Sequence, residues 1–575
     1  MRKNILTYLV ILIASIILSL PLVKPGLYVI HDDQQIARLF VFDQALKFGQ
    51  FPVRWVEGLG FGFGYPLFVF YPPFVYILGE IFHVFGFGFV NSIKLVFFVS
   101  IFASGLSMHI FAKEFWGRLT AVIAALFYMF IPYRALDIYV RGALAESFSF
   151  VWLPLILWSF YKLISTNKIA YVYLSATFLA LLMITHNLIF LPFMLILPFY
   201  LLFLFLNSKD KRLLTSHFSL LILLAAGLSA FFWIPALLEK KFTIVDQLLL
   251  VNLANYNIHF VYPWQLWNWP WGFGGSAAGL ADGISFKIGK LHILVSLAVF
   301  IFSVIILLKN SRNKKFSTLN SQFSILIFAL FILSAFMTTF YSKFIWDLIQ
   351  PLGYLQFPWR FLTFTALFSS FLAGGLIYYL RLPILKLLAS LILIILLIIP
   401  NLKLFKPQTY RPNLTDRIAT SKDIINWEIS ESSFEYLPKG VPMYVGPLGT
   451  NLVKIDKGDI PKQRVEILSG TAALENLKTE TSKVTFSIDA KEKTKVQINN
   501  FNFPGWIAKI DQSKVTIDDN NRLKLISLTI PEGVHQVIVE FKNTPVRFMA
   551  NMISFLSVIL ITFLIFKKWQ IPSIH

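Results

Sequence analysis

The feature that most constrains the fold of this chain is a series of long apolar runs joined by short polar connections. The first run covers residues 5–23 (ILTYLVILIASIILSLPLV), and comparable runs follow along most of the chain. A helix needs roughly 20 apolar residues to cross the hydrocarbon core of a bilayer. Charged residues make up only 14% of the chain, whereas soluble domains carry roughly 25%. The sequence therefore predicts a polytopic α-helical membrane protein.

We expect about twelve membrane-spanning helices from the apolar runs. The first is preceded by Arg2 and Lys3, and we interpret it as an uncleaved anchor, with a cleaved signal peptide as the alternative. The expected spans cover residues 5–23, 91–112, 119–133, 146–163, 169–184, 188–206, 215–236, 291–308, 321–340, 361–379, 384–400 and 547–566.

A further apolar stretch, residues 66–85, does not fit the pattern of a span. Three prolines, including Pro72 and Pro73, each remove a backbone donor. Glu80 would be costly in hydrocarbon unless it faced protein or water. We therefore predict a helix at the membrane interface here, and a second interfacial helix at 34–49.

Basic residues sit at the ends of the apolar runs, so the formal net charge of +21 does not indicate nucleic-acid binding. If 66–85 does not span, basic groups such as Lys113 with Arg118 and Lys162 with Lys168 all fall on one side. Basic residues in short connections mark the cytoplasmic side, so we expect both termini in the cytoplasm. The chain has no cysteine, which excludes disulfides and Cys-ligated zinc.

The long connections all fall on the opposite, extracytoplasmic side, where we expect the chemistry. The longest, 401–546, is polar and alternating, which predicts an extracytoplasmic β-sandwich between the transmembrane domain, 1–400, and a final span with a cytoplasmic tail, 547–575. Its expected strands cover residues 464–470, 483–490, 494–503, 513–519, 522–530 and 535–542.

Two adjacent carboxylates, Asp32 and Asp33, follow the first span in the stretch HDDQQIAR. One interpretation makes them solvated caps of the helix at 34–49, because acidic residues suit a helix N-terminus. The other makes one of them a general base for an acceptor that arrives from outside the membrane. Neighbouring residues on an extended chain point to opposite sides, so we expect the two to differ in role.

Several motifs resemble bacterial membrane proteins described as 6-pyruvoyl-tetrahydropterin synthase-related. They are HDDQQIAR, GQFPVRWVEGLGFGFGYPLFVFYPP, YRALDIYVRGALAE, THN, QLWNWPWGFGGS with FKIG, QFPWRFL, FPGW and TPVRF. The order of the anchor, the acidic first outer loop, the Pro-Pro interfacial helix and a second acidic outer loop resembles the GT-C superfamily of membrane glycosyltransferases. No histidine cluster suits the zinc site of a pterin synthase.

The GT-C resemblance implies a polyprenyl-phosphate sugar donor, a location in the bacterial inner membrane, and catalysis by acids of the outer loops. Asp32 matches the first-loop acid, with Asp33 beside it, and Asp137 or Glu146 matches the second. Some members of the superfamily bind a divalent metal, so Asp32 and Asp137 could hold Mg²⁺ or Mn²⁺.

A phosphate leaving group requires cations, and four arginines are expected at the outer face. Each could instead reach toward lipid headgroups. They are Arg54, Arg134, Arg141 and Arg360, and Asp137 precedes Arg141 by four residues, a spacing that pairs them on a helix.

His186 lies in a tight turn between two spans, which favours a place in the site. Trp271 is one of four tryptophans in 264–271, which either stack on sugar rings or form an interfacial belt. Two functions are open: a glycosyltransferase acting on an unidentified glycan, lipid or protein acceptor, and a transporter or scaffold that handles polyprenyl lipids without chemistry. A transporter should place ionisable residues near the middle of its spans, and here the acids gather in outer loops.

Overall fold

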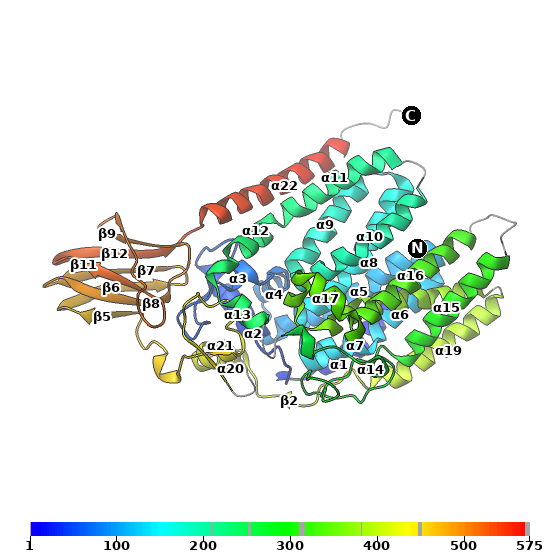
Figure 1. Ribbon diagram of the computed structural model, residues 1–575, viewed down its shortest axis with the longest axis horizontal. Coiled ribbons are helices and arrows are strands. Elements are labelled where there is room, and N and C mark those ends of the chain that lie inside the picture. Colours follow the sequence, from blue (N-terminus) through cyan, green and yellow to red (C-terminus); the bar gives the residue numbers. More distant parts are fainter. Residues whose placement is uncertain are drawn as a thin grey trace.

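The computed structural model describes residues 2–208, 211–250, 255–309, 317–380, 382–446 and 451–569, and it confirms a polytopic helical membrane protein with a β-rich domain near its C-terminus (Figure 1). Within these ranges, nine helices are long and apolar enough to cross a bilayer. They are α1 (Arg2–Val23), α5 (Phe89–Trp116), α8 (Leu144–Thr166), α10 (Asn187–Leu206), α15 (Lys290–Lys309), α16 (Ser317–Met337), α18 (Leu362–Tyr379), α19 (Pro383–Leu402) and α22 (Pro545–Trp569).

The remaining three expected spans are bent or short helices. α6 (Arg118–Phe130) continues at an angle of 42° into α7 (Pro132–Leu136) and the π-helical turn η1 (Asp137–Arg141). α11 (Lys211–Leu228) meets α12 (Ala230–Glu239) at 70°. α9 (Ala170–Thr185) has 16 residues. The apolar runs predicted all of these segments, but no sequence pattern predicted the two bends.

Pro132 explains the first bend. It stands at the first position of α7, where its missing N–H costs nothing, and it cannot donate back to the carbonyls of α6. After the bend, the chain continues in a different direction through α7 and then through η1, which is a wider helical turn. Such π-turns are common at functional sites, and this one carries Asp137 and Arg141.

Short helices cover the outer end of the bundle. α2 (Gln35–Lys47) lies within the segment predicted as an interfacial helix at 34–49. The stretch 66–85 is divided into α3 (Leu67–Phe70) and α4 (Phe74–Val84) at its Pro-Pro pair. α4 has 11 residues, which is about 16 Å of helix and too short to cross a membrane.

α18 forms the centre of the helical core, where it packs against α6, α15 and α16. It is apolar on all sides, which is typical of a buried helix. Gly374 lets Trp116 lie directly on it, because a Cβ there would come within 2.7 Å of the Trp116 ring. The Trp116 indole N–H donates to the Phe371 carbonyl at 2.9 Å.

The β-domain contains two antiparallel sheets whose apolar faces share one core, as the predicted sandwich requires. Their orders are β10-β9-β12-β7-β6 and β11-β8-β5. The strands are β5 (Val465–Ser469), β6 (Ala472–Glu480), β7 (Lys483–Ala490), β8 (Thr494–Phe501), β9 (Trp506–Ile510), β10 (Ser513–Val515), β11 (Leu525–Ile530) and β12 (Gly533–Phe541).

Two of these strands, β6 and β9, were not predicted from the sequence. β6 (AALENLKTE) is an edge strand with a register irregularity and mostly solvent-facing side chains, so it lacks the alternation that marks a half-buried strand. β9 (WIAKI) is only 5 residues long.

The first part of the segment 401–546 lies on the helical domain and not in the sandwich. β2 (Tyr410–Arg411) pairs with β1 (Leu27–Tyr28) just after the first span. α20 (Asp416–Ala419), η8 (Ile424–Glu428) and α21 (Ile429–Ser432) follow. Both Asp416 carboxylate oxygens accept backbone N–H groups of Phe89 and Val90 at 2.9 Å, so this segment caps α5.

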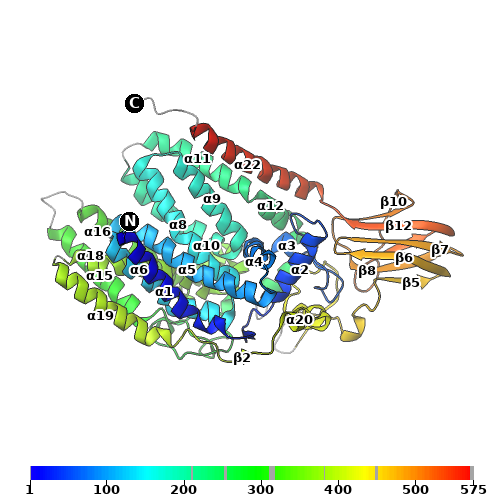
Figure 2. The same cartoon turned by 180° about the vertical axis from the view of Figure 1, so that it is seen from behind.

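The start of α1 and the end of α22 both lie at the end of the bundle away from the sandwich (Figures 1 and 2). α1 runs from there toward the long loops and α5 runs back, so Lys113 and Arg118 fall at the same end as the start of α1. The C-terminal tail beyond 569 lies outside the described residues.

We predict that the sandwich is extracytoplasmic and the basic end of the bundle cytoplasmic. Because the chain has no cysteine, Lys491→Cys in the sandwich and Lys168→Cys at the basic end each introduce a single exposed thiol. A membrane-impermeant maleimide should label Lys491→Cys in intact cells and Lys168→Cys only after permeabilisation. Labelling of Lys168→Cys in intact cells would reverse the orientation.

Candidate functional site

A buried carboxylate, Glu146 at the start of α8, organises the candidate site. It is 1% exposed. One oxygen accepts hydrogen bonds from the Tyr133 hydroxyl at 2.6 Å and the Thr363 hydroxyl at 3.2 Å. The other accepts from Arg141 at 2.8 Å and lies 3.8 Å from the Arg360 Nε. Burying a charge is costly unless it is paired and hydrogen-bonded, and here both conditions are met.

Arg141 connects two acids. The same guanidinium nitrogen also donates to Asp137 at 2.6 Å, the i,i+4 pairing that the sequence indicated. The second Asp137 oxygen is buried, with no hydrogen-bond partner among the described residues. The Arg141 guanidinium lies over the Trp359 ring at 4.6 Å, so its position is fixed by packing as well as by charge.

Arg360, just before the start of α18, makes fewer hydrogen bonds than Arg141. Its side chain is buried, yet the Nε and one terminal nitrogen have no hydrogen-bond acceptor within the part of the chain that the structure describes. Its ion pair with Glu146 is long. A buried N–H without an acceptor costs about 1–3 kcal/mol, so an anionic ligand at this position would be stabilised.

Asp32 is held beside these arginines by the backbone. Its N–H donates to the Arg141 carbonyl at 2.7 Å, and the N–H of His31 donates to the Val140 carbonyl at 3.1 Å. The side chains of Tyr28 and Gln35 donate to the carbonyls of Ile138 and Gly142. These carbonyls belong to the end of the bent span, where a helix leaves acceptors unpaired.

The Asp32 carboxylate interacts electrostatically with Arg141 and Arg360. It forms no side-chain hydrogen bond with any residue that the structure describes, and Gln34, the capping residue of α2, makes no side-chain cap either. The capping interpretation of the acidic pair therefore has no support in the hydrogen bonding, and the Asp32 carboxylate remains open to a ligand.

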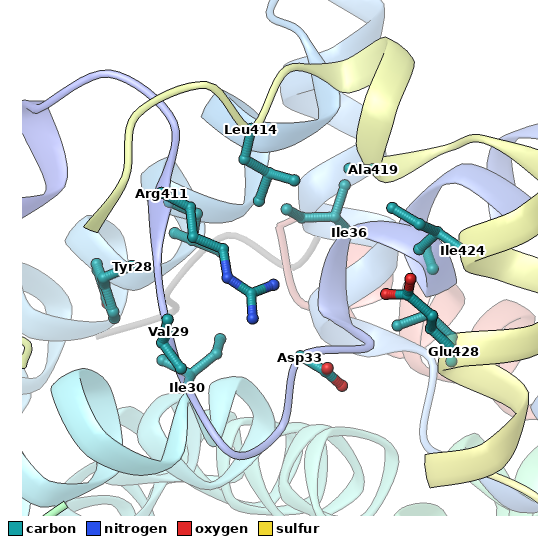
Figure 3. Close-up of a pocket in the computed structure, with 13 residues that line it drawn as sticks. Tyr28, Val29, Ile30, Asp33, Ile36, Arg411, Leu414, Ala419, Ile424 and Glu428 are labelled. Atoms are coloured by element: carbon teal, nitrogen blue, oxygen red, sulfur yellow. The ribbon is translucent and has the colours of Figure 1, made fainter. Parts of the chain in front are cut away.

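Asp33 faces a different environment from its neighbour. It lines a cavity of about 50 Å³ together with Arg411 and Glu428 from the C-terminal segment (Figure 3). Burial raises the pKa of the Asp33 carboxyl above its ordinary value even though the side chain reaches solvent, and the Arg411 guanidinium opposes this shift. The two adjacent acids thus face different groups, as their positions on an extended chain predicted.

A second charged group adjoins the site and was not predicted from the sequence. Arg38 on α2 donates to the Ser433 hydroxyl at 2.8 Å, lies 3.8 Å from Glu435 and stacks over Tyr71 at 4.2 Å. Tyr71 interacts electrostatically with both Arg38 and Asp32. The C-terminal segment that contributes Ser433 and Glu435 lies far from α2 in the sequence, so no local pattern could show this contact.

Two predicted site arginines form their hydrogen bonds with other parts of the chain, although Arg134 also interacts electrostatically with Asp137. Arg134 is fully buried between helices, where it donates to the Ser147 carbonyl at 2.5 Å and the Ser100 hydroxyl at 3.1 Å. Arg54 donates to the Phe231 carbonyl at 2.6 Å and to Asn551 on α22 at 3.0 Å. Neither makes a hydrogen bond to the acids around Arg141, and neither reaches toward lipid headgroups.

His186 and Trp271 lie near the site with different roles. His186 interacts electrostatically with Glu146, while its Nδ1 accepts the Ile189 N–H at 3.0 Å at the start of α10. Trp271 is partly buried, with Lys287 5.5 Å from its ring centre. Its loop contacts the acidic loop through the Phe273 carbonyl, which lies 3.0 Å from the His31 ring.

The exposure of the tryptophans in this loop separates those that suit an interfacial belt from the one that suits stacking on a sugar ring. Trp264 and Trp267 are exposed, as expected of an interfacial belt. Trp271 is partly buried against the core, so its position suits binding of a ligand better than a place in the interfacial belt.

The surroundings of Asp32 and Asp137 do not suit the Mg²⁺ or Mn²⁺ that the resemblance implies. Asp137 is paired to Arg141, and Asp32 has two guanidinium groups as its charged neighbours. In the described ranges, no group of three or more His, Asp or Glu side chains is placed to hold a metal ion. A divalent cation between these acids would meet positive charge on two sides.

Gly142 permits the close approach of the acidic loop, and its substitution should disturb Asp32 without touching it. The glycine has φ +68°, and a Cβ there would come within 2.4 Å of Ile30. We expect Gly142→Ala to lower the midpoint of thermal unfolding of the purified protein and to reduce any activity that depends on Asp32.

Gly117→Ala is the matched control. Gly117 also has a positive φ, +81°, but a Cβ there meets nothing within 4 Å. Its ψ of 170° lies in a backbone region that is essentially confined to glycine, so Gly117→Ala should show only a backbone cost of about 1–3 kcal/mol. Equal destabilisation by both variants would mean that the contact with Ile30 is unimportant.

Comparison with known proteins supports the first resemblance over part of the chain. Residues 68–269 match the model of a family described as "6-pyruvoyl-tetrahydropterin synthase related domain; membrane protein". An uncharacterized protein of Lactococcus lactis subsp. cremoris is 26% identical over 342 residues, which cover 57% of this chain and 53% of the relative. The chain thus spans about half the length of that relative.

Among solved structures, ArnT from Cupriavidus metallidurans bound to undecaprenyl phosphate is similar, with a TM-score of 0.42 and 14% identity. The match covers 68% of this chain and 62% of ArnT.

Proposed function

We propose that the chain is a membrane glycosyltransferase that moves a sugar from a polyprenyl-phosphate donor to an extracytoplasmic acceptor. The observation that carries the proposal is Arg360, a buried guanidinium beside Arg141 and Asp32, two of whose nitrogens have no hydrogen-bond acceptor among the described residues. A planar guanidinium matches phosphate oxygens with two parallel hydrogen bonds. A phosphate would supply the acceptors that the described residues do not.

The location of the arginines suits a lipid-linked phosphate. Arg360 precedes α18, and Arg141 ends the bent span, so both lie where the helices meet the outer loops. A phosphate bound between them would leave its polyprenyl chain in the bilayer. The similar ArnT structure contains undecaprenyl phosphate, which is a lipid of this class.

Glu146 keeps the two arginines in place for this task. Its hydrogen bonds with Tyr133, Thr363 and Arg141 fix its orientation. The two guanidinium groups and the carboxylates of Glu146 and Asp137 together carry no net charge, so these arginines offer a phosphate hydrogen-bond donors, above all the two Arg360 nitrogens without an acceptor among the described residues. Donors that are positioned in advance stabilise developing charge without reorganisation.

The reaction follows from these positions. An acceptor hydroxyl attacks the anomeric carbon of the sugar, and Asp32 takes the hydroxyl proton as the new carbon–oxygen bond forms. The bond between the anomeric carbon and the phosphate oxygen breaks, and its electron pair leaves with the phosphate, where Arg141 and Arg360 stabilise the added charge. The products are the glycosylated acceptor, polyprenyl phosphate and protonated Asp32, which then loses its proton to water.

We expect Asp32→Asn to abolish transfer of labelled sugar from membrane lipid to acceptor, because a neutral amide cannot take the proton. Asp33→Asn should keep measurable transfer, since its carboxylate faces the neighbouring cavity. The assay compares membranes with each variant at matched expression. Loss in Asp33→Asn with full activity in Asp32→Asn would assign the base to Asp33.

Comparison of Arg360→Gln with Asp32→Asn distinguishes loss of phosphate binding from loss of the general base. Arg360→Gln should reduce transfer by about 10²–10³-fold, as removal of one preorganised donor does, and it should also weaken binding of polyprenyl phosphate. Asp32→Asn should leave that binding intact. If all three variants transfer at the normal rate, the assignment of these residues to the base and the donor site is wrong. Membranes that transfer no more sugar with the unaltered chain than without it would favour the alternative of a non-catalytic lipid transporter or scaffold.

We also expect transfer to continue after removal of divalent cations. In this proposal Arg141 and Arg360 neutralise the phosphate, and no group of three or more acids and histidines in the described part of the chain is placed to hold a cation. Washing membranes with EDTA should change the rate less than twofold. A loss that Mg²⁺ or Mn²⁺ restores would require the acids to rearrange around a metal.

A further inference from the structure

The cavity on the Asp33 side of the acidic pair has its own charged lining. Figure 3 shows the Arg411 guanidinium on one side of it and the Glu428 carboxylate on the other, with the Asp33 carboxylate turned away from Arg411. Within the described residues, Arg411 forms no ion pair with either carboxylate. The remaining walls are apolar and include Ile36, Leu414 and Ile424.

Backbone contacts hold the segments that carry these charges. β1 and β2 pair Leu27 with Arg411 and so fix Arg411 beside the loop that leads to Asp33. Asp416 attaches the residues that follow Arg411 to the start of α5. Glu428 belongs to η8, which comes after Asp416 in the chain. The cavity is therefore built from two segments that are each attached to the helical domain.

We propose that this cavity binds a small zwitterionic head group, with a primary ammonium between Asp33 and Glu428 and a phosphate or carboxylate on Arg411. Two carboxylates and one guanidinium leave a net negative charge, and an ammonium relieves the repulsion between like charges. An anion on the same ligand completes the hydrogen bonds of Arg411.

The size of the cavity limits what enters it. A volume of about 50 Å³ has room for a few water-sized groups. It therefore accepts a head group while the rest of the ligand stays outside. Binding of a head group in this cavity does not depend on the proposed function, because Asp33 lines the cavity and Asp32 faces Arg141 and Arg360.

Binding can be measured on the purified full-length chain by isothermal titration with O-phosphoethanolamine. Ethanolamine lacks the anion, ethyl phosphate lacks the ammonium, and phosphocholine has an ammonium that cannot donate hydrogen bonds. We expect each of the three to bind at least tenfold more weakly than O-phosphoethanolamine. Equal binding by ethanolamine or ethyl phosphate would overturn the zwitterion assignment.

Charge-removing variants locate the site. Arg411→Gln and Glu428→Gln should each weaken binding about tenfold or more, as truncation of one partner of a charge pair does. Lys422→Gln and Asp423→Asn are matched controls, because they remove the same charges from exposed positions of the same segment that do not line the cavity. Equal effects of lining and control variants would overturn the site.

Two further comparisons identify the source of the head group and separate this inference from the proposed function. If the ligand is a lipid, phosphatidylethanolamine in nanodiscs should compete with O-phosphoethanolamine and phosphatidylcholine should not; no competition by either would make it a free solute. Binding that fails while Asp32→Asn still abolishes transfer would overturn only the cavity. Binding that persists in a chain without transferase activity would overturn only the proposed function.

Discussion

The site depends on the buried carboxylate of Glu146. Removing one partner of a buried charge pair typically costs about 3–5 kcal/mol, because it leaves a charge without compensation. Glu146 has two guanidinium groups and two hydroxyls as its partners. These partners come from the bent span and from α18, so one acid determines how the outer ends of several helices meet.

The acidic loop follows from a second constraint, the unpaired carbonyls at the end of the bent span. Pro132 interrupts the helix, η1 widens it, and Gly142 ends it in a left-handed conformation. The loop that carries Asp32 donates backbone hydrogen bonds to the carbonyls that the helix leaves unpaired. Backbone hydrogen bonds, and not the acid's own side chain, therefore place Asp32 beside the arginines.

Much of this could be predicted from the sequence, because apolar runs and i,i+4 spacing are local signals. Asp137 with Arg141 was predictable in this way, as were the helical segments and most strands. The roles of Arg54 and Arg134 were not, since an outer-loop arginine that bonds to carbonyls of distant helices has the same local sequence as one that faces a ligand. Arg38 and Glu435 were missed because their contact joins residues almost 400 positions apart.

The pairing of β1 with β2 has a consequence for biogenesis. The acidic loop is among the first segments to leave the ribosome, its arginine neighbours follow in two stages, and Arg411 and Glu428 come only after α19. A nascent chain inserted as far as α18 would hold Arg141 and Arg360 but not the neighbouring cavity. The order of synthesis thus delays completion of the site until the C-terminal segment has been made and has packed against the acidic loop.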